Sequence, residues 1–278
     1  MECEWTEAQY ERLAGLDAQQ EVLSKRFSGT LERDQMFVQL SRELAAAGRE
    51  RLKGFRDGVR EPSLCRLGES LGKALEKEGF CWVVTPTIIS RSMLGKMTID
   101  ESHDLYSQVF WLDRNKCLRP MLAPNLYSVS KDLLRLWEPP VRVFEIGSCF
   151  RKESQGNTHL NEFTMLNFVE WGIEKEKRGE RLRFLADVVM QAAGLPGYRF
   201  EEENSVVYGD TLDVMCGGVE AASGAMGPHV LDGAWGIDST WVGMGFGLER
   251  LLMLKNGGRN VKSYGRSLSY LDGISLKL

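Results

Sequence analysis

The sequence predicts an α+β fold in which helices flank an antiparallel sheet. β-rich runs follow one another with short polar turns between them, and helical periodicity occurs before, between and after these runs. The strand–helix–strand alternation of a parallel sheet does not occur. With 278 residues, of which 43% are hydrophobic and 27% charged, the chain can bury a large core and has the composition of a soluble globular protein.

Composition excludes several classes of protein. No apolar run reaches about 18 residues, and the N-terminal segment MECEWTEAQYERL is acidic, so we expect no membrane span, no signal peptide and a cytoplasmic location. The six cysteines form no CxxC pair and the three histidines lack metal-ligand spacing, which favours reduced thiols and no structural zinc site. The net charge of −4 argues against extensive coating by nucleic acid but leaves a local basic face open.

Residues 1–60 have the leucine spacing of helices. Within them, residues 42–60 contain six basic and three acidic side chains, a net charge of +3 in an acidic protein. This basic segment could lie along a phosphate backbone, or it could be the solvated face of a helix. The residues that we consider for the first role are Arg42, Arg49, Arg51 and Lys53.

The next part of the chain begins at Glu61-Pro62, because proline suits the first turn of a helix. Leucines at 64, 67, 71 and 75 predict one buried helix face, which Gly79 ends. The β-rich run FCWVVTPTII is interrupted by Pro86, which predicts a strand at a sheet edge or a break, as at a subunit contact. Residues 109–113 and 117–121 predict a hairpin.

A helix opening at Pro124 and Asn125 is followed by the strand VRVFEIG and the stretch FRKESQGNTHLNEF. The pattern predicts a hairpin that continues through TMLNFVEWG. Because side chains alternate along a strand, Arg151 and Glu153 would address one ligand together, such as a phosphate with an attached base. His159 in the loop could equally be an internal hydrogen-bonding group. A long amphipathic helix over residues 174–193 follows.

The last third is β-rich and contains two further candidate sites. In GMGFGLER, three alternating glycines would leave one strand face without side chains, against which a flat ligand could lie. Arg250, which follows them, could bind a phosphate. The alternative is a glycine-rich turn with a solvated arginine. Glu220 and Ser223 could hold Mg²⁺ together with substrate oxygens, or could be a surface carboxylate beside a buried hydroxyl. Asn167 and Tyr208 lie in apolar strands and need either an internal partner or a ligand.

In their order along the chain, the Pro-broken strand, the FRKE segment and the glycine run ending in LER resemble motifs one, two and three of the class II aminoacyl-tRNA synthetase family. The resemblance is strongest to the branch of that family specific for pyrrolysine. It is carried by LRPMLAPNLY, FEIGSCFRKES, HLNEFTMLNF, VVYGDTLDV and GFGLERLL, and covers essentially residues 1–278.

The resemblance implies a site for ATP and Mg²⁺. Arg151 would bind the α-phosphate, Glu153 the adenine amino group, and Phe163 would stack on the adenine. His159 and Arg250 would reach the β- and γ-phosphates, and Glu220 and Ser223 would hold Mg²⁺. The implied ATP-binding set is Arg151, Glu153, His159, Leu160, Phe163, Glu220, Ser223, Gly245 and Arg250, of which Arg151, Glu220 and Arg250 would be catalytic.

The resemblance also implies a pocket for the amino acid. Its residues would be Ala123, Leu126, Tyr127, Ser130, Asn167, Val169, Tyr208, Ala225 and Trp241. Asn167 would hydrogen-bond the side-chain amide of the substrate and Tyr208 would close over its ring. Small residues at 123, 169 and 225 leave volume for a long lysine derivative. Ser130 stands where a larger apolar residue is expected in relatives, which would make the pocket wider or wetter.

We therefore expect a homodimeric ligase that activates pyrrolysine, or a close Nε-acyl lysine, with ATP and transfers it to a cognate tRNA. Residues 1–60 would be a helical extension that contacts tRNA, and residues 61–278 the catalytic domain. Residues 1–60 resemble only the short helical extension and not the separate tRNA-binding domain of some relatives, so we expect that a partner chain supplies that domain or that tRNA binds without it. The alternatives are a class II enzyme for another amino acid and a non-catalytic paralogue that binds tRNA or an amino acid; Arg151, Glu220 and Arg250 weigh against the paralogue.

Overall fold

The computed structural model describes residues 2–152, 159–205, 207–258 and 260–278. The chain divides into two compact units, residues 1–63 with 262–278 and residues 64–261. The first division lies close to the boundary expected at residue 60. The second division assigns residues 262–278 to the smaller unit, whereas the sequence analysis expected them in the catalytic domain.

The smaller unit consists of helices and a short hairpin. Its elements are α1 (Glu7–Gly15), α2 (Gln20–Leu23), α3 (Thr30–Arg56), β10 (Tyr270–Leu271) and β11 (Ile274–Ser275), with the 3₁₀ turn η3 (Val261–Ser263) at the division between the units. The turn of the hairpin is fixed by Asp272, whose carboxylate accepts hydrogen bonds from Ser63 N at 2.8 Å and Ser63 Oγ at 3.0 Å. A Cβ on Gly48 of α3 would lie 3.0 Å from Leu278, so this glycine permits the C-terminus to pack closely against the helix.

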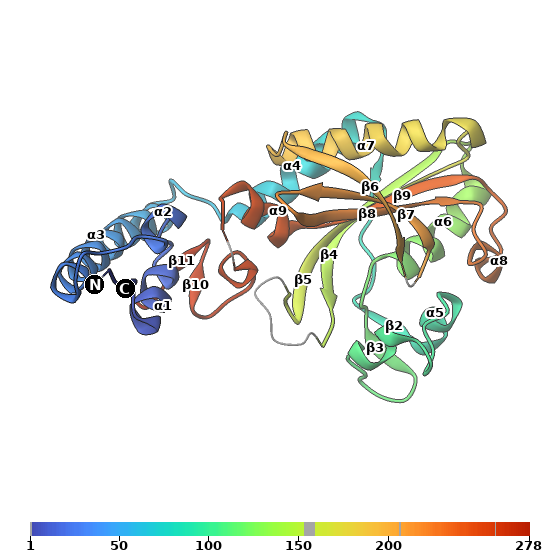
Figure 1. Ribbon diagram of the computed structural model, residues 1–278. Coiled ribbons are helices and arrows are strands. Elements are labelled where there is room, and N and C mark those ends of the chain that lie inside the picture. The colour runs from blue at the N-terminus through green and yellow to red at the C-terminus, as the bar shows by residue number, and fades with distance from the viewer. Residues whose placement is uncertain (1, 153–158, 206, 259) are drawn as a thin grey trace. The chain divides into compact units, whose positions relative to one another are not determined.

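The larger unit is built on a seven-stranded sheet with the order β1-β4-β5-β9-β8-β7-β6 (Figure 1). The strands are β1 (Cys81–Trp82), β4 (Val141–Phe150), β5 (Glu162–Trp171), β6 (Tyr198–Ser205), β7 (Gly209–Cys216), β8 (Val219–Gly227) and β9 (Trp241–Gly247). All neighbours are antiparallel except β1 and β4, which are parallel. The predicted α+β class is confirmed, with one parallel pair at the edge.

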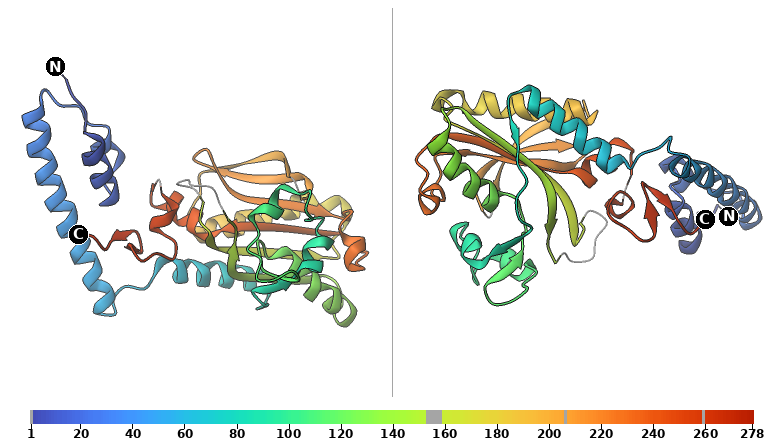
Figure 2. Two further views of the ribbon diagram at one scale, coloured as in Figure 1. Left: turned by 90° about the horizontal axis from the view of Figure 1, so that it is seen from below. Right: turned by 180° about the vertical axis from the view of Figure 1, so that it is seen from behind.

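Helices cover both faces of this sheet. On one face lie α4 (Ser63–Lys77) and α7 (Arg178–Ala193); on the other lie α6 (Ala123–Leu136) and the small layer of β2 (Ile88–Ser90), β3 (Lys116–Leu118) and α5 (Arg91–Lys96) (Figure 1; Figure 2). Three of the four leucines expected on the inner face of α4 are buried, at 67, 71 and 75. The short elements η1 (Asp104–Gln108), η2 (Lys175–Lys177), α8 (Asp232–Trp235) and α9 (Leu248–Lys255) complete the unit.

The run around Pro86 breaks as predicted. Its first part is the edge strand β1, and its second part leaves the main sheet as β2. The predicted hairpin of residues 109–121 is confirmed, because Leu112 N donates to Lys116 O at 2.9 Å and Leu118 N donates to Phe110 O at 3.0 Å. The other edge of β3 pairs with β2, which the sequence did not predict. Residues 109–113 contribute one isolated bridge, Trp111 to Cys117. Asp113 stabilises the turn, since its Oδ1 accepts from Asn115 N at 2.7 Å and Lys116 N at 2.8 Å. The local hairpin therefore forms, and a strand distant in sequence extends it to a longer ladder.

In the part of the chain that the structure describes, no helix combines the length and apolar character that a membrane span requires.

Candidate active site

One row of side chains crosses five strands of the sheet on the face covered by α6. Consecutive cross-strand partners are Glu145, Asn167, Gly245, Ser223 and Asp213, on β4, β5, β9, β8 and β7. Directly paired residues of antiparallel strands lie on the same face. The row therefore brings Asn167 and Ser223, predicted for two different ligands, to either side of a single glycine.

The alternating glycines of β9 lie on this face, as their spacing predicts. A Cβ at position 245 would lie 2.9 Å from Asn167 Nδ2, and one at position 243 would lie 3.0 Å from the carbonyl oxygen of Phe168. Real Cβ atoms need more room than this. Glycine at 245 thus preserves the position of the Asn167 amide.

A pocket opens on this row and has an empty volume of about 490 Å³, space open to solvent included. It is lined by Ala123, Leu126, Tyr127, Asn167, Phe168, Val169, Trp171, Tyr208, Thr211, Ser223, Gly224, Ala225, Trp241, Gly243, Met244 and Gly245. The structure thus brings together every residue expected for the amino-acid pocket except Ser130. Ser130 is fully buried, and its hydroxyl has no hydrogen-bond partner among the described residues.

Trp171 and Thr211 also line the pocket, and sequence reasoning missed them. Trp171 follows Val169 at the two-residue spacing of a strand, and Thr211 precedes Asp213 in the same way. This period could have revealed Trp171 from Val169, which the sequence assigns to the pocket, and Thr211 only once Asp213 was known to belong to the row.

The pocket contains polar atoms that the protein leaves without partners. In the described part of the chain, Asn167 Oδ1 and Thr211 Oγ1 are buried and make no hydrogen bond. A buried polar group without a partner costs about 1–3 kcal/mol. Both atoms are thus available to hydrogen-bond a polar group of a ligand in an otherwise apolar pocket.

A bulge in β8 places Glu220 on the pocket side of the sheet. Residues three apart on a regular strand point to opposite faces, which would separate Glu220 from Ser223. The register shifts between Val214, which pairs with Ala222, and Met215, which pairs with Glu220. The extra residue turns the Glu220 side chain to the face of Ser223.

Arg250 adjoins this carboxylate. Its Nη1 donates to the Glu220 carbonyl oxygen at 2.7 Å and lies 3.4 Å from Glu220 Oε1. The preceding Glu249 is buried, and both of its carboxylate oxygens accept from Thr164 N at 2.9 Å, which ties the start of α9 to β5. The positions of Arg250 and Glu220 are therefore set by backbone contacts.

Arg151 lies just past the end of β4, where its Nε donates to Pro120 O at 2.9 Å. Its guanidinium lies 5.5 Å from the ring centroid of Phe163, so the predicted phosphate and adenine contacts are neighbours. His159 is exposed and Leu160 is half-buried. Glu153, the predicted adenine contact, lies outside the described residues.

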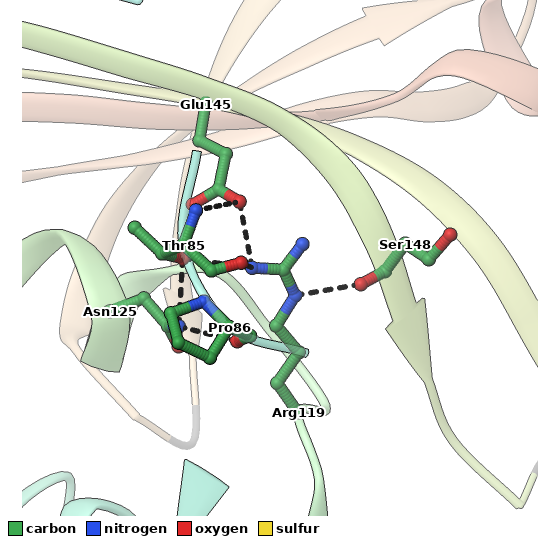
Figure 3. Close-up of polar contacts among 6 residues, drawn as sticks. All are labelled: Thr85, Pro86, Arg119, Asn125, Glu145 and Ser148. Atoms are coloured by element: carbon green, nitrogen blue, oxygen red, sulfur yellow. Dashed lines mark hydrogen bonds and ion pairs between the residues drawn. The ribbon is translucent and has the colours of Figure 1, made fainter. Parts of the chain in front are cut away.

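At the β4 end of the row lies a buried ion pair that the sequence did not reveal (Figure 3). Arg119 Nη1 donates to Glu145 Oε1 at 2.8 Å, and Arg119 Nε donates to Ser148 O at 2.8 Å. Thr85 Oγ1 donates to Glu145 Oε2 at 2.6 Å and accepts from Asn125 Nδ2 at 2.8 Å. A buried charge pair is tolerated when hydrogen bonds satisfy its remaining atoms. The network joins the start of α6, which carries pocket residues, to the strand that leads to Arg151.

In the smaller unit, α3 separates the predicted basic residues. Arg42, Arg49 and Lys53 are exposed and, at 3.6 residues per turn, share one face of the helix. Arg51 points away from that face and forms an ion pair with Asp17 at 3.1 Å. Arg56 also lies on the exposed face.

Comparison with known proteins agrees with this geometry. Residues 95–272 match the family "tRNA synthetases class II core domain (F)". A crystal structure of pyrrolysyl-tRNA synthetase from Desulfitobacterium hafniense is 55% identical, covers 99% of both chains and superimposes with a TM-score of 0.93. A second structure, of D. hafniense PylSc, is 53% identical with a TM-score of 0.90, and covers 99% of this chain and 96% of that chain.

A more distant relative is the phenylalanine–tRNA ligase alpha subunit of Sulfurisphaera tokodaii, which is 32% identical over 201 residues. The match covers 66% of this chain but only 42% of that subunit. The chain belongs to the class II aminoacyl-tRNA synthetases and, within them, to the pyrrolysyl-tRNA synthetase family.

Proposed function

We propose that the chain activates pyrrolysine, or a closely related Nε-acyl lysine, with ATP to form an aminoacyl-adenylate, and then transfers the aminoacyl group to its cognate tRNA. The observation that carries the proposal is the single pocket that runs from aromatic residues to Ser223 and Gly245. One cavity can then hold an amino-acid side chain at one end and present its carboxylate near the expected ATP at the other.

The amino-acid end suits a long, mostly apolar side chain with one amide. Ala123, Val169 and Ala225 are small or short residues on its walls, and the unpaired buried Asn167 Oδ1 can accept a hydrogen bond from an amide N–H. Tyr208 and Trp241 pack edge-to-face with centroids 6.0 Å apart and would enclose the distal ring. This is the basis for preferring a lysine derivative to a smaller substrate.

At the other end, adenylation brings a carboxylate to the α-phosphorus of ATP and expels pyrophosphate. The approach of two anions and the charge on the pentavalent transition state must be neutralised. Arg151, fixed by Pro120 O, would bind the α-phosphate, and Arg250, fixed by Glu220 O, would bind the terminal phosphates together with His159. Phe163 beside Arg151 would stack on adenine, with Leu160 and Glu153 at its edge.

The residues present fit a magnesium ion. The bulge puts the Glu220 carboxylate and the Ser223 hydroxyl on one face, and hard oxygen ligands are those that Mg²⁺ prefers. The next residue in the row, Asp213, is buried with Oδ1 unpaired in the described structure, and it adds an oxygen that sequence reasoning did not consider. When bound, Mg²⁺ would neutralise charge on the phosphates of ATP.

The transfer step needs no nucleophile from the protein. A terminal ribose hydroxyl of tRNA attacks the carbonyl carbon of the adenylate, AMP leaves, and the hydroxyl proton departs with the products or solvent. The protein's part in both steps is to position the reactants and stabilise charge. We place this reaction in the cytoplasm.

We also propose that the enzyme is a homodimer. Trp82 of the edge strand β1 is 39% exposed, and Val84 and Ile88 in the segment that follows are 88% and 51% exposed. Edge strands with exposed apolar side chains are suited to pairing with another chain. Val84→Glu should shift the mass measured by light scattering from twice 31.4 kDa toward 31.4 kDa, and a wild-type chain that is monomeric at micromolar concentration would refute the dimer.

The proposed activity is tested by ATP–pyrophosphate exchange with a panel of amino acids, followed by aminoacylation of the cognate tRNA with and without a separately supplied tRNA-binding domain. We expect exchange with pyrrolysine or Nε-acyl lysines. Exchange with ordinary amino acids alone would indicate a different specificity. If no amino acid of the panel supports exchange, the chain would be a non-catalytic protein that binds tRNA or an amino acid.

A further inference from the structure

A single buried carboxylate joins two walls of the pocket. Asp232, at the start of α8, is 3% exposed. Its Oδ1 accepts from Tyr127 Oη at 2.8 Å, and its Oδ2 accepts from Trp241 Nε1 at 2.9 Å. Tyr127 belongs to α6 and Trp241 to β9, and both line the pocket. One side chain outside the lining thus fixes two large aromatic residues from different elements.

The same carboxylate also fixes His229, because Asp232 Oδ2 accepts from His229 N at 2.6 Å. The His229 ring reaches a third wall of the pocket. Its Nδ1 accepts a hydrogen bond from Leu231 N at 3.2 Å, so in the neutral ring the proton is on Nε2. Nε2 lies 3.1 Å from the carbonyl oxygen of Tyr208 and donates to it.

The protonation states agree with these directions of donation. Burial, together with the nearby charge of Asp232, raises the pKa of Tyr127 and of Tyr208 above their ordinary value. Tyr127 therefore keeps its proton at neutral pH and donates it to Asp232. Removing the carboxylate would leave the Tyr127 hydroxyl and the Trp241 indole N–H buried without these partners.

The aromatic packing places α8 against the same wall. Trp235 of α8 stacks on Tyr127, with centroids 5.4 Å apart and an interplanar angle of 13°. The Lys96 ammonium lies 4.7 Å from the centroid of the Trp235 ring. The helix is short, and what it contributes to the pocket is support for Tyr127 in addition to the Asp232 carboxylate.

We infer that Asp232 and His229 are positioning residues that set amino-acid selectivity by holding Tyr127, Trp241 and Tyr208 in place. The inference rests on the proposed function for the identity of the ligand. Neither residue lines the pocket. They act through the residues that do, so their loss should change which side chain is accepted more than it changes the use of ATP.

The test compares disruptive and conservative variants in pyrophosphate exchange. Asp232→Leu removes all three acceptor contacts and keeps the number and branching of side-chain heavy atoms, and Asp232→Asn keeps an oxygen acceptor. His229→Leu removes the donor to Tyr208, and His229→Gln can restore an N–H donor. The loss of one such hydrogen bond corresponds to about a fivefold change.

We expect His229→Leu to raise the KM for a long Nε-acyl lysine about fivefold, and Asp232→Leu to raise it more. The KM for ATP should change less than twofold. His229→Gln and Asp232→Asn should partly restore the KM for the lysine derivative. The ratio of kcat/KM for long over short acyl chains should fall in both Leu variants. Equal changes in both KM values, or an unchanged chain-length ratio in folded variants, would overturn the inference.

His103→Leu is a matched control. His103 Nδ1 accepts from Leu105 N at 3.1 Å, the same backbone contact that His229 Nδ1 makes with Leu231 N, whereas the hydrogen bond to Tyr208 O is made by His229. Thermal unfolding of each variant separates loss of stability from loss of selectivity. A selectivity change in the control as large as that of His229→Leu would also overturn the inference.

A second readout does not require activity. In the NMR spectrum, the signal of the Trp241 indole N–H can be assigned by its loss in Trp241→Phe. In Asp232→Leu this signal should shift, and the proton should exchange faster with D₂O. Both changes should be much smaller in Asp232→Asn. An unchanged signal in Asp232→Leu would refute the positioning contact. If the wild-type chain is inactive in exchange while the indole signal behaves as expected, the proposed function fails and the positioning contact stands.

Discussion

The two ends of the site are held in place by different means. At the phosphate end, the guanidinium groups of Arg151 and Arg250 are fixed by backbone carbonyl oxygens, and Glu220 is 49% exposed at its side chain. At the amino-acid end, buried aromatic residues depend on one carboxylate that lies outside the pocket lining.

The difference follows from what each end must do. A triphosphate with Mg²⁺ is recognised by charge, which acts over several ångströms and needs only the right groups on a firm backbone. An apolar side chain is recognised by shape, and a pocket keeps its shape only if the side chains behind its lining are also fixed. Changes at the first end should therefore affect rate, and changes at the second should affect choice of substrate.

The largest expected effect is at the phosphate end. Arg250→Ala removes a cation beside Glu220 and the expected phosphates, so kcat/KM for pyrophosphate exchange should fall about a hundredfold. Amino-acid binding, measured by calorimetry without ATP, should change less than threefold. Lys73→Ala, an exposed ion-pair residue on α4, serves as the control. Equal losses in exchange and in amino-acid binding would contradict the separation of the two ends.

A smaller effect is expected at Gly245, which lies between the ends. A Cβ at this position would meet the Asn167 amide at 2.9 Å, so Gly245→Ala should displace that amide and raise the amino-acid KM about tenfold, at a cost of about 1–3 kcal/mol. The KM for ATP should rise less. Gly95→Ala is a suitable control, because a Cβ there meets nothing within 4 Å. A larger rise in the KM for ATP would assign Gly245 to the phosphate end instead.

The smallest expected effect concerns charge in the other unit. Arg49 is exposed on α3, whereas Arg51 is paired with Asp17. If exposed charge contacts the tRNA backbone, Arg49→Gln should raise the KM for tRNA about two- to threefold and leave adenylation unchanged. The slope of the logarithm of the binding constant against the logarithm of salt concentration should fall by about the amount that one phosphate contact contributes. Arg51→Gln should change the salt dependence less. If the two variants have the same KM for tRNA at low salt, the basic segment is better interpreted as a solvated helix face.

Local patterns predicted the elements of the site but not how all of them combine. The β4–β5 hairpin, the one-sided glycines of β9 and the break at Pro86 follow from alternation, turn residues and proline geometry, all of which act over a few residues. The β2–β3 pairing and the bulge opposite Val214 depend on strands distant in sequence. No local period indicates which distant strand will supply the ladder.

The order of the chemical groups was determined by the sequence itself: an arginine at the end of β4, an asparagine on β5, a carboxylate and hydroxyl on β8, and an arginine after a glycine-rich strand. These residue types define what chemistry is possible. Tertiary structure decided which of them share a cavity. It turned Glu220 to the face of Ser223, kept Ser130 out of the pocket lining and separated Arg51 from Arg49. It also brought Tyr127 to Asp232, 105 residues further along the chain. Such contacts depend on strand register and helix packing, which are set by the fold as a whole.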